Sequence, residues 1–232
     1  MATYNVKSAL ARIGGLSQPS KMPCYGYSLP ASLCPIGAKL AKQAGTVCSG
    51  CYATKGAYAW SNTQRALRRR YDLVSEALRD ESARADYIGA FSWLLNYRRA
   101  AWKPGRANDT RYFRWHDSGD IQNLDHFSLI VDICKATPGV RHWLPTRELP
   151  TVRRYMREIG PLPANLRVRA SAARIDAPAP QVDGIGAGSA VHSVANQPPR
   201  GASECGAYLN DGECGDCRAC WDDDTAVSYR KH

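Results

Sequence analysis

The segments "RYFRWH" (residues 111–116), "VRHWLP" (140–145) and "LRVRAS" (166–171) are short and rich in aromatic and aliphatic residues, which is typical of β-strands. Between them, residues 123–137 and 149–159 place apolar side chains at the spacing of an amphipathic helix. Strands that alternate with helices in this way form parallel βα units. The sequence therefore predicts an α/β fold around a parallel sheet.

Further elements extend this pattern on both sides. Amphipathic helices are expected at 64–79 and at 84–101. Strands are expected near "GTVCSGCYA" (45–53), at "SAVHSV" (189–194) and at "AVSYRKH" (226–232). The chain then reaches about six βα units, which predicts a TIM-like (βα) barrel with cysteine-rich metal-binding loops. Because no repeat or long polar run divides the chain, we expect a single domain over residues 1–232.

Charge and cysteine content bear on partners and compartment. Lys and Arg number 31 against 21 Asp and Glu, and the net charge of +10 favours acidic partners such as nucleic acid. Part of the excess lies at 68–70 and 98–99, on helix faces expected in solvent. The chain has neither a membrane-spanning apolar run nor a secretory signal, so we expect a cytoplasmic protein without membrane contact. Nine cysteines in that compartment indicate metal or redox chemistry rather than disulfides.

Seven of the nine cysteines form two groups. The early trio is Cys34, Cys48 and Cys51, and the terminal quartet is Cys205, Cys214, Cys217 and Cys220. Each group contains a C-x2-C pair, which lets one loop turn two thiolates toward one centre. The run C-x2-C-x2-C at 214–220 is typical of an iron-sulfur loop, so the terminal quartet favours a [4Fe-4S] cluster over zinc.

The early trio offers three ligands rather than four. A cluster held by three thiolates keeps one iron open, and an open metal position can bind and activate a small molecule. Cys24 is a possible fourth ligand that would close this position. A zinc site, or thiols with a purely structural role, would also explain the trio. Cys134 shares the apolar face of its helix and is expected in the core.

Polar side chains on three predicted strands indicate a functional cavity, because an unpaired cation in a core is costly. In a βα barrel the reactive face lies at the carboxyl ends of the strands. An imidazole beside a carboxylate at such an end suits proton transfer. We expect catalytic roles for His116, Asp117, Asp120, Arg147 and Glu148, and substrate-binding roles for Arg114, Ser118, Arg169 and Ser171. Several of these residue types also occur in turns, in helix caps and in surface charge pairs, which are structural roles without chemistry.

Four motifs together resemble the gene product 88 family of tailed bacteriophages. They are "CSGCYA" (48–53), "FRWHDSGD" (113–120), "HWLPTRE" (142–148) and "CGDCRACW" (214–221). The resemblance implies a phage origin, and hence the cytoplasm of the host cell. It also implies that the early trio and the terminal quartet supply the metal ligands.

A looser similarity is to radical S-adenosylmethionine enzymes, which have a partial βα barrel, an early cysteine trio and often a late cysteine-rich cluster. The early trio departs from their pattern, because its spacing is C-x13-C-x2-C instead of C-x3-C-x2-C. Gly50 also stands before the last cysteine, where those enzymes place an aromatic residue.

Two classes of function follow from these features. The first is a phage-encoded iron-sulfur enzyme, radical-SAM-like or redox, acting at the barrel mouth on a small anionic substrate or with S-adenosylmethionine. The alternative is a protein in which iron-sulfur or zinc stabilises a surface for nucleic acid or a host protein, without catalysis. Electron transfer alone is a third possibility. Nuclease and protease functions find no support, since no repeated carboxylate set or nucleophile motif is present.

Overall fold

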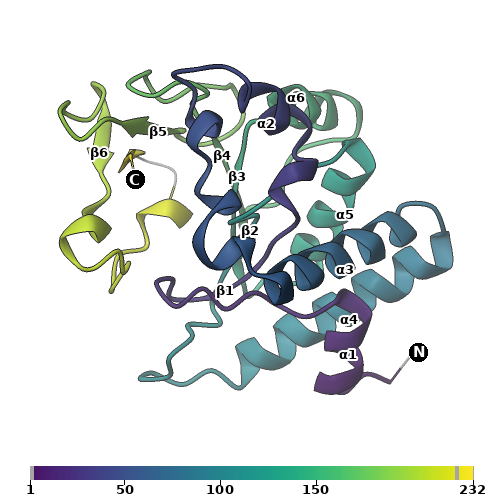
Figure 1. Ribbon diagram of the computed structural model, residues 1–232. Helices are drawn as coiled ribbons and strands as arrows, with labels where there is room; N and C mark the ends of the chain where they lie inside the picture. The colour runs from purple at the N-terminus through teal and green to yellow at the C-terminus, as the bar shows by residue number, and fades with distance from the viewer. Residues whose placement is uncertain (1–2, 223–224, 232) are drawn as a thin grey trace.

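The computed structural model describes residues 3–222 and 225–231 and is built around a four-stranded parallel sheet (Figure 1). The strands follow one another across the sheet in the order β1-β2-β3-β4. They are β1 (Tyr25–Tyr27), β2 (Tyr112–Trp115), β3 (Arg141–Thr146) and β4 (Leu166–Ala170). The three strands predicted from the central segment are therefore confirmed, and β1 was not predicted.

Helices cover one side of this sheet. They are α1 (Val6–Ile13), α3 (Ser61–Ala77), α4 (Glu81–Ala100), α5 (Leu124–Lys135) and α6 (Leu149–Glu158), whereas the short α2 (Pro35–Leu40) gives no residue to the core. Asp80 caps α4 and Asn123 caps α5, because each side chain accepts a hydrogen bond from a backbone N–H of the first turn. The predictions of α3, α4, α5 and α6 are therefore confirmed, whereas α1 and α2 were not predicted.

The main core fills the space between the sheet and these helices. Alternate residues of the strands, such as Phe113 and Trp115, point into it and are buried. Phe91 of α4 lies against both rings, with centroids 5.7 and 5.2 Å away. Cys134 belongs to this core, as predicted. In the part of the chain that is described, no helix is long and apolar enough to cross a membrane.

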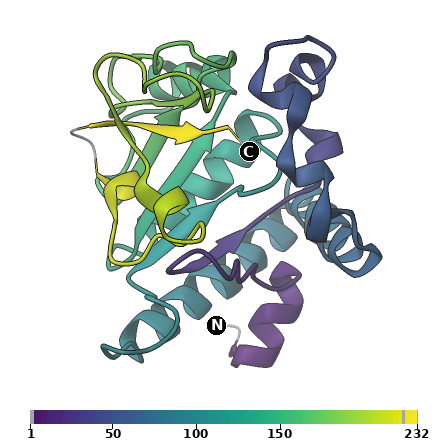
Figure 2. The same cartoon turned by 60° about the vertical axis from the view of Figure 1, so that its left-hand side comes forward.

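The C-terminal segment lies on the opposite side of the sheet (Figures 1 and 2). It forms a second parallel sheet of β5 (Ser189–His192), β6 (Ala202–Glu204) and β7 (Ala226–Arg230), in the order β5-β7-β6. A single bridge between Ser171 and Ser189 joins the end of β4 to β5. A small second core of Cys24, Trp143 and Trp221 lies between the first sheet and the terminal loop.

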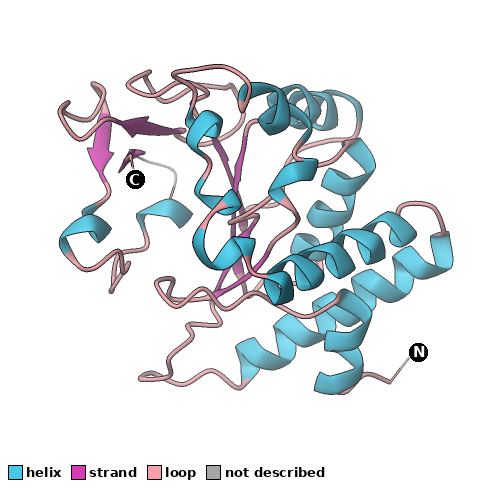
Figure 3. Cartoon of the chain, viewed as in Figure 1, coloured by secondary structure: helices cyan, strands magenta, loops and turns pink. Residues whose placement is uncertain are grey.

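The predicted TIM-like barrel of about six units is not confirmed. Within residues 3–222 and 225–231 the strands form two parallel sheets and no closed barrel. After α6 the only helical segments of the described chain are the 3-10 turns Gly206–Leu209 and Ala219–Trp221, which are drawn as short helices in Figure 3, so the last strands lack the α-helical crossovers of βα units. The Pro- and Gly-rich loop 176–188 does not favour a helix there.

The strand predicted near 45–53 is wrong. This segment forms the 3-10 turns Val47–Gly50 and Tyr52–Thr54. Thr46 caps the first turn, because its Oγ1 accepts a hydrogen bond from the N–H of Ser49 at 3.1 Å. Short polar side chains that bond to the nearby backbone in this way compete with strand pairing.

Candidate functional site

The carboxyl ends of the strands bring the predicted polar residues together. Asp120 follows β2, and its carboxylate accepts hydrogen bonds from Oγ1 of Thr146 at 2.6 Å and from the backbone N–H of Arg147 at 3.0 Å, both at the end of β3. Burial raises the pKa of the Asp120 carboxyl, although these donors favour its ionised form. Asp120 therefore ties two strand ends into one site.

The turn after β2 is locked against the chain that follows β1. The Ser118 hydroxyl donates to the carbonyl of Leu29 at 2.9 Å. Gly119 has φ +84°, and a Cβ on it would lie 2.7 Å from the Cβ of Leu29, so only glycine fits there. Ser118 thus has a positioning role in this arrangement, and its predicted contact with a substrate stays a prediction.

His116 and Asp117 hold buried polar atoms without hydrogen-bond partners among the described residues. Both ring nitrogens of His116 are in this state, as is Oδ1 of Asp117. His116 has φ +53°, an uncommon conformation for a residue with a side chain. Burial lowers its pKa well below the usual value, so the imidazole is neutral. Buried polar atoms without partners, in a turn with an uncommon backbone conformation, are typical of a binding site.

Two tyrosines that no sequence pattern had indicated hold Asp117 in place. The hydroxyl of Tyr58 donates to Oδ2 of Asp117 at 2.6 Å. The hydroxyl of Tyr52 donates to the backbone carbonyl of Asp117. Tyr52 directly follows Cys51, so these contacts connect the early trio to the end of β2. The only sequence signal was the tyrosine pair in "CYATKGAY" (51–58), which has no periodicity to indicate its role.

The three cysteines of the early trio approach the same edge from two turns. Cys34 precedes α2, while Cys48 and Cys51 lie in and after the turn Val47–Gly50. The N–H of Val47 donates to the carbonyl of Ala173, beyond β4, at 2.9 Å. The trio is thus held over the carboxyl ends of the strands, where open parallel sheets bind ligands.

Gly37 leaves room between two of these thiols. A Cβ on Gly37 would lie 2.8 Å from Cβ of Cys34, which is too close, and 3.5 and 3.8 Å from the Sγ atoms of Cys34 and Cys48. Burial, together with the negative charges of Asp120, Cys51 and Cys48, raises the pKa of the Cys34 thiol to about 12. The glycine therefore marks a space that two thiols border.

Glu148 contacts the helix that follows Cys34. Its Oε1 accepts a hydrogen bond from the N–H of Ile36 at 2.7 Å. Burial raises the pKa of this carboxyl. Nε of Arg147 donates to the carbonyl of Ala172 at 3.2 Å. Both side chains border the early trio, as their predicted roles require, and those roles stay predictions.

The terminal quartet surrounds the loop after β6. The N–H of Cys205 donates to the backbone carbonyl of Ser228 in β7 at 2.8 Å. The N–H of Cys214 donates to the backbone carbonyl of Lys21 at 3.1 Å. Sγ of Cys220 lies 3.2 Å from the hydroxyl of Tyr229. Burial raises the pKa of Cys220 to about 11. Cys217 is exposed.

Arg169 anchors the quartet loop. Its buried guanidinium donates to six backbone carbonyls, those of Ala187, Gly188, Ala219, Cys220, Asp222 and Thr225. Because its N–H groups are bonded to the protein's own backbone, Arg169 has a positioning role. Its predicted contact with a substrate stays a prediction. Ser171 lies nearby, with its hydroxyl 3.3 Å from that of Ser189.

No group of three or more His, Cys, Asp or Glu residues within residues 3–222 and 225–231 is arranged to hold a metal ion. The predicted metal-binding loops therefore exist as cysteine-rich loops, and their metal binding is not supported by this arrangement. Cys24 is buried in the second core rather than beside the early trio.

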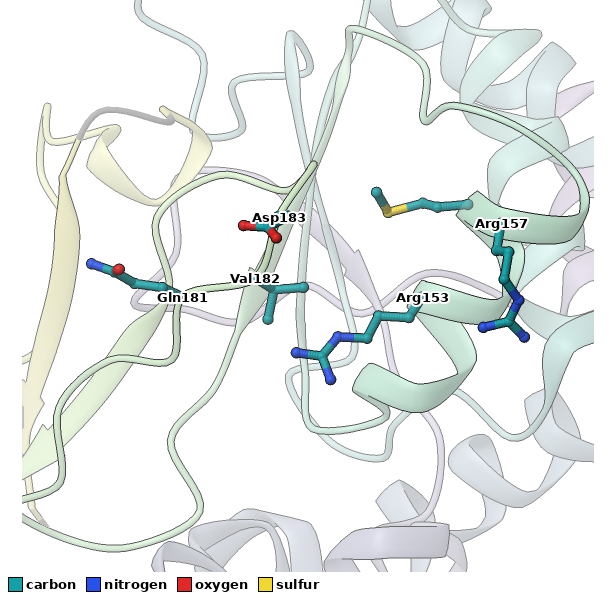
Figure 4. A pocket seen from close by; sticks show the side chains of 6 residues that line it. Arg153, Arg157, Gln181, Val182 and Asp183 are labelled. Carbon is teal, nitrogen blue, oxygen red and sulfur yellow. The ribbon is translucent and has the colours of Figure 1, made fainter.

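A surface cavity of about 450 Å³ lies elsewhere, between α6 and the loop after β4 (Figure 4). It is lined by Arg153, Met156, Arg157, Gln181, Val182 and Asp183. None of the predicted site residues lines it, so the cavity is separate from the site at the strand ends.

Comparison with models of protein families matches residues 3–223 to gene product 88. The chain belongs to the gene product 88 family. This membership confirms the predicted family and supports the predicted phage origin. No curated protein matches the chain. No solved structure matches it either, and the looser similarity to radical S-adenosylmethionine enzymes finds no support.

Proposed function

We propose that this gene product 88 protein is an iron-sulfur protein whose early trio forms a redox or substrate-activating centre. The carrying observation is that three thiols from two turns approach the carboxyl ends of a parallel sheet, beside Asp120 and Arg147. This edge is where parallel sheets place their ligands. Because the sheet is open, the proposed site lies at this edge and not at the mouth of a barrel.

The donor set of the early trio fits a soft metal. Thiolates favour iron-sulfur clusters, zinc and copper(I) over hard cations. Burial and neighbouring negative charge raise the pKa of the Cys34 thiol, so a bound cation is needed to keep such thiols ionised together. Cys34, Cys48 and Cys51 would hold the [4Fe-4S] cluster, which would supply an open iron or a one-electron centre.

The chain's own residues would orient a substrate beside this group. Asp120 and Glu148 are carboxyls whose pKa values burial raises, and this shift favours holding a proton in comparison with an ordinary carboxyl. His116 is neutral and has two ring nitrogens available for a hydrogen bond. Asp117 offers Oδ1, Arg147 offers positive charge, and Ser171 lies at the end of β4.

The terminal quartet would hold a second cluster with no open position. Four thiolates complete the coordination of a [4Fe-4S] cluster, and zinc is the less favoured metal. Its loop is fixed to the sheet by Arg169. This supports a structural or electron-carrying role rather than substrate binding.

The test is anaerobic purification followed by measurement of iron, sulfide and zinc per chain and electron paramagnetic resonance of the reduced protein. One cluster corresponds to about four iron and four sulfide per chain. A signal that shifts on adding S-adenosylmethionine would support an open centre with that cofactor. Zinc without sulfide would contradict the proposal.

Variants assign the metal to each group. Replacing the early trio by serine should remove the open centre and leave the other signal, and replacing Cys214, Cys217 and Cys220 should do the reverse. Cys134→Ala is the matched control, because this thiol lies in the main core, and it should keep the full metal content.

A binding role without catalysis is the second candidate, favoured by the net charge of +10. In that case closed metal sites would stabilise a surface for nucleic acid or a host protein. Binding of nucleic acid should then weaken steeply with salt, because displaced counterions drive it. Salt-insensitive or absent binding would contradict this candidate.

A further inference from the structure

Arg114 occupies the centre of the sheet face that looks toward the C-terminal segment. It pairs in register with Trp143 of β3 and with Gly26 of β1, so the three residues form one row across the sheet. The guanidinium carbon lies 4.6 Å from the centroid of the Trp143 ring. Because the residue beside Arg114 on β1 is Gly26, no side chain lies at that position of the row.

The guanidinium has only weak partners. Nη2 lies 3.5 Å from the hydroxyl of Tyr52, and Nη1 lies 3.5 Å from Sδ of Met22. Nε is buried and has no hydrogen-bond partner among the described residues, and the same holds for Nε1 of Trp143. Across the same residues, Arg114 forms no ion pair with a carboxylate.

Arg169 shows how this chain satisfies a buried arginine when the role is structural. It lies on the same sheet face two strands away, and six carbonyls accept its hydrogen bonds. A cation withdrawn from water without an anion or a full set of acceptors is costly. Arg114 is half-buried, and Asp117 and Tyr52 favour its charge without forming an ion pair or a short hydrogen bond with it. Its guanidinium therefore lacks the set of acceptors that Arg169 has.

We propose that Arg114, with Trp143, binds an oxyanion group, a carboxylate or a phosphate, carried by a small molecule. The guanidinium fork matches the two oxygens of such a group, and the indole N–H beside it is a further donor. Tyr52 places this position next to Cys51 and the early trio. The inference rests on the proposed function in naming its substrate class, but the anion site itself requires no metal.

The test is isothermal titration calorimetry with sodium phosphate and with sodium benzoate, at an ionic strength matched with sodium chloride. Wild-type protein should show saturable binding of at least one of these anions, and Arg114→Gln should weaken it at least about tenfold. Arg114→Lys should give an intermediate loss, because it keeps the charge and loses the fork. Circular dichroism would verify that each variant is folded.

Arg141→Gln is the matched control. Arg141 lies on the neighbouring strand, is exposed, and its guanidinium lies 3.6 Å from Asp222, so its removal should leave anion binding unchanged. Equal affinity in wild type and Arg114→Gln, or binding of neither anion, would overturn the proposal. An equal loss in Arg141→Gln would do so too, since it would indicate a general charge effect.

Metal loading separates this proposal from the proposed function. Titrations are run on protein with and without bound metal, and binding should persist in both. Loss of anion binding on loading would overturn the anion site, because the metal-bound thiolates would then be the partner of Arg114. Phosphate or benzoate binding by a protein that takes up no metal would refute the iron-sulfur proposal alone.

Discussion

The two cysteine-bearing regions are held to the same sheet in different ways. The early trio is attached by separate bonds from several strand ends, such as those of Glu148 and Ala173. The terminal quartet has backbone bonds to Lys21 and Ser228 as well, but most of its side-chain attachment is concentrated in Arg169, which donates to carbonyls within and beside the quartet loop. Removal of one bond should therefore weaken the trio region only in part, whereas removal of Arg169 leaves several carbonyls of the quartet loop without donors at once.

The largest expected effect comes from removing that anchor. Arg169→Gln leaves several buried carbonyls without donors, and we expect it to lower the free energy of unfolding by about 3 kcal/mol or more. Urea unfolding would measure this loss. Limited proteolysis should cut first between residues 205 and 222, while the early trio region stays protected.

The matched control for Arg169→Gln is again Arg141→Gln. This arginine is exposed in a surface ion pair, and its loss should change the unfolding free energy by less than about 1 kcal/mol. Similar losses in the two variants would show that Arg169 is not the anchor of the quartet.

A smaller effect is expected from one attachment of the early trio region. The buried Oγ1 of Thr146 donates to Asp120 at 2.6 Å and accepts from the N–H of Glu148 at 3.0 Å. Thr146→Val removes both bonds with little change of shape, and we expect a loss of about 2 kcal/mol in urea unfolding. Proteolysis of the quartet loop should stay at the wild-type level.

Thr54→Val is the control for this variant. Its exposed hydroxyl donates to the carbonyl of Cys51 at 2.8 Å, where water can replace it. The expected change is within about 0.5 kcal/mol. If Thr54→Val cost as much as Thr146→Val, the attachment at the strand ends would not be special.

The scaffold beneath both regions should lose stability in acid. Burial lowers the pKa values of His126 and His142 to about 3, from an ordinary value near 6.5. Nδ1 of His142 accepts from Nε1 of Trp115 at 3.2 Å, so the proton of the neutral ring is assigned to Nε2, beside Thr137. Both rings stay neutral in the fold, while the unfolded chain gains protons below pH 6.5.

Stability is therefore fully present above about pH 6.5 and is lost as the pH falls toward 3, by about 1.4 kcal/mol per pH unit for each histidine. Denaturant unfolding of metal-free protein at pH 7, 6 and 5 would measure the slope. His142→Asn should reduce that slope by the contribution of one group. A slope that is unchanged in His142→Asn would rule out this cause.

The sequence predicted the elements that local patterns specify. β2 to β5, β7 and α3 to α6 were predicted because each carries a strand or helix pattern of its own. β1 and β6 have three residues each, too few for a period to be detected. The prediction of a barrel was wrong because closure of a barrel depends on how distant segments meet. The described chain after β4 also has no α-helical crossover, as its later strands follow one another without an α-helix.

The site was predicted as far as the geometry of parallel sheets determines it. The rule that strand ends meet at one edge placed Asp120 near Arg147, and their hydrogen bond confirms this placement. The acceptors of Arg169 could not be predicted, because they are backbone carbonyls 18 to 56 positions away in the sequence. The contacts of Tyr52 and Tyr58 with Asp117 are equally long-range.

The smallest expected effect concerns the second arginine of the sheet face, Arg114. Because Arg114 makes only two hydrogen-bond contacts, each 3.5 Å long, and one stacking contact with Trp143, Arg114→Gln should change the unfolding free energy by less than about 1 kcal/mol in anion-free buffer. The difference from wild type should then grow in phosphate, because a bound anion stabilises only the protein that binds it. Urea unfolding in both buffers measures this. A loss as large as that of Arg169→Gln without phosphate would show that the chain itself, and not an anion, satisfies Arg114.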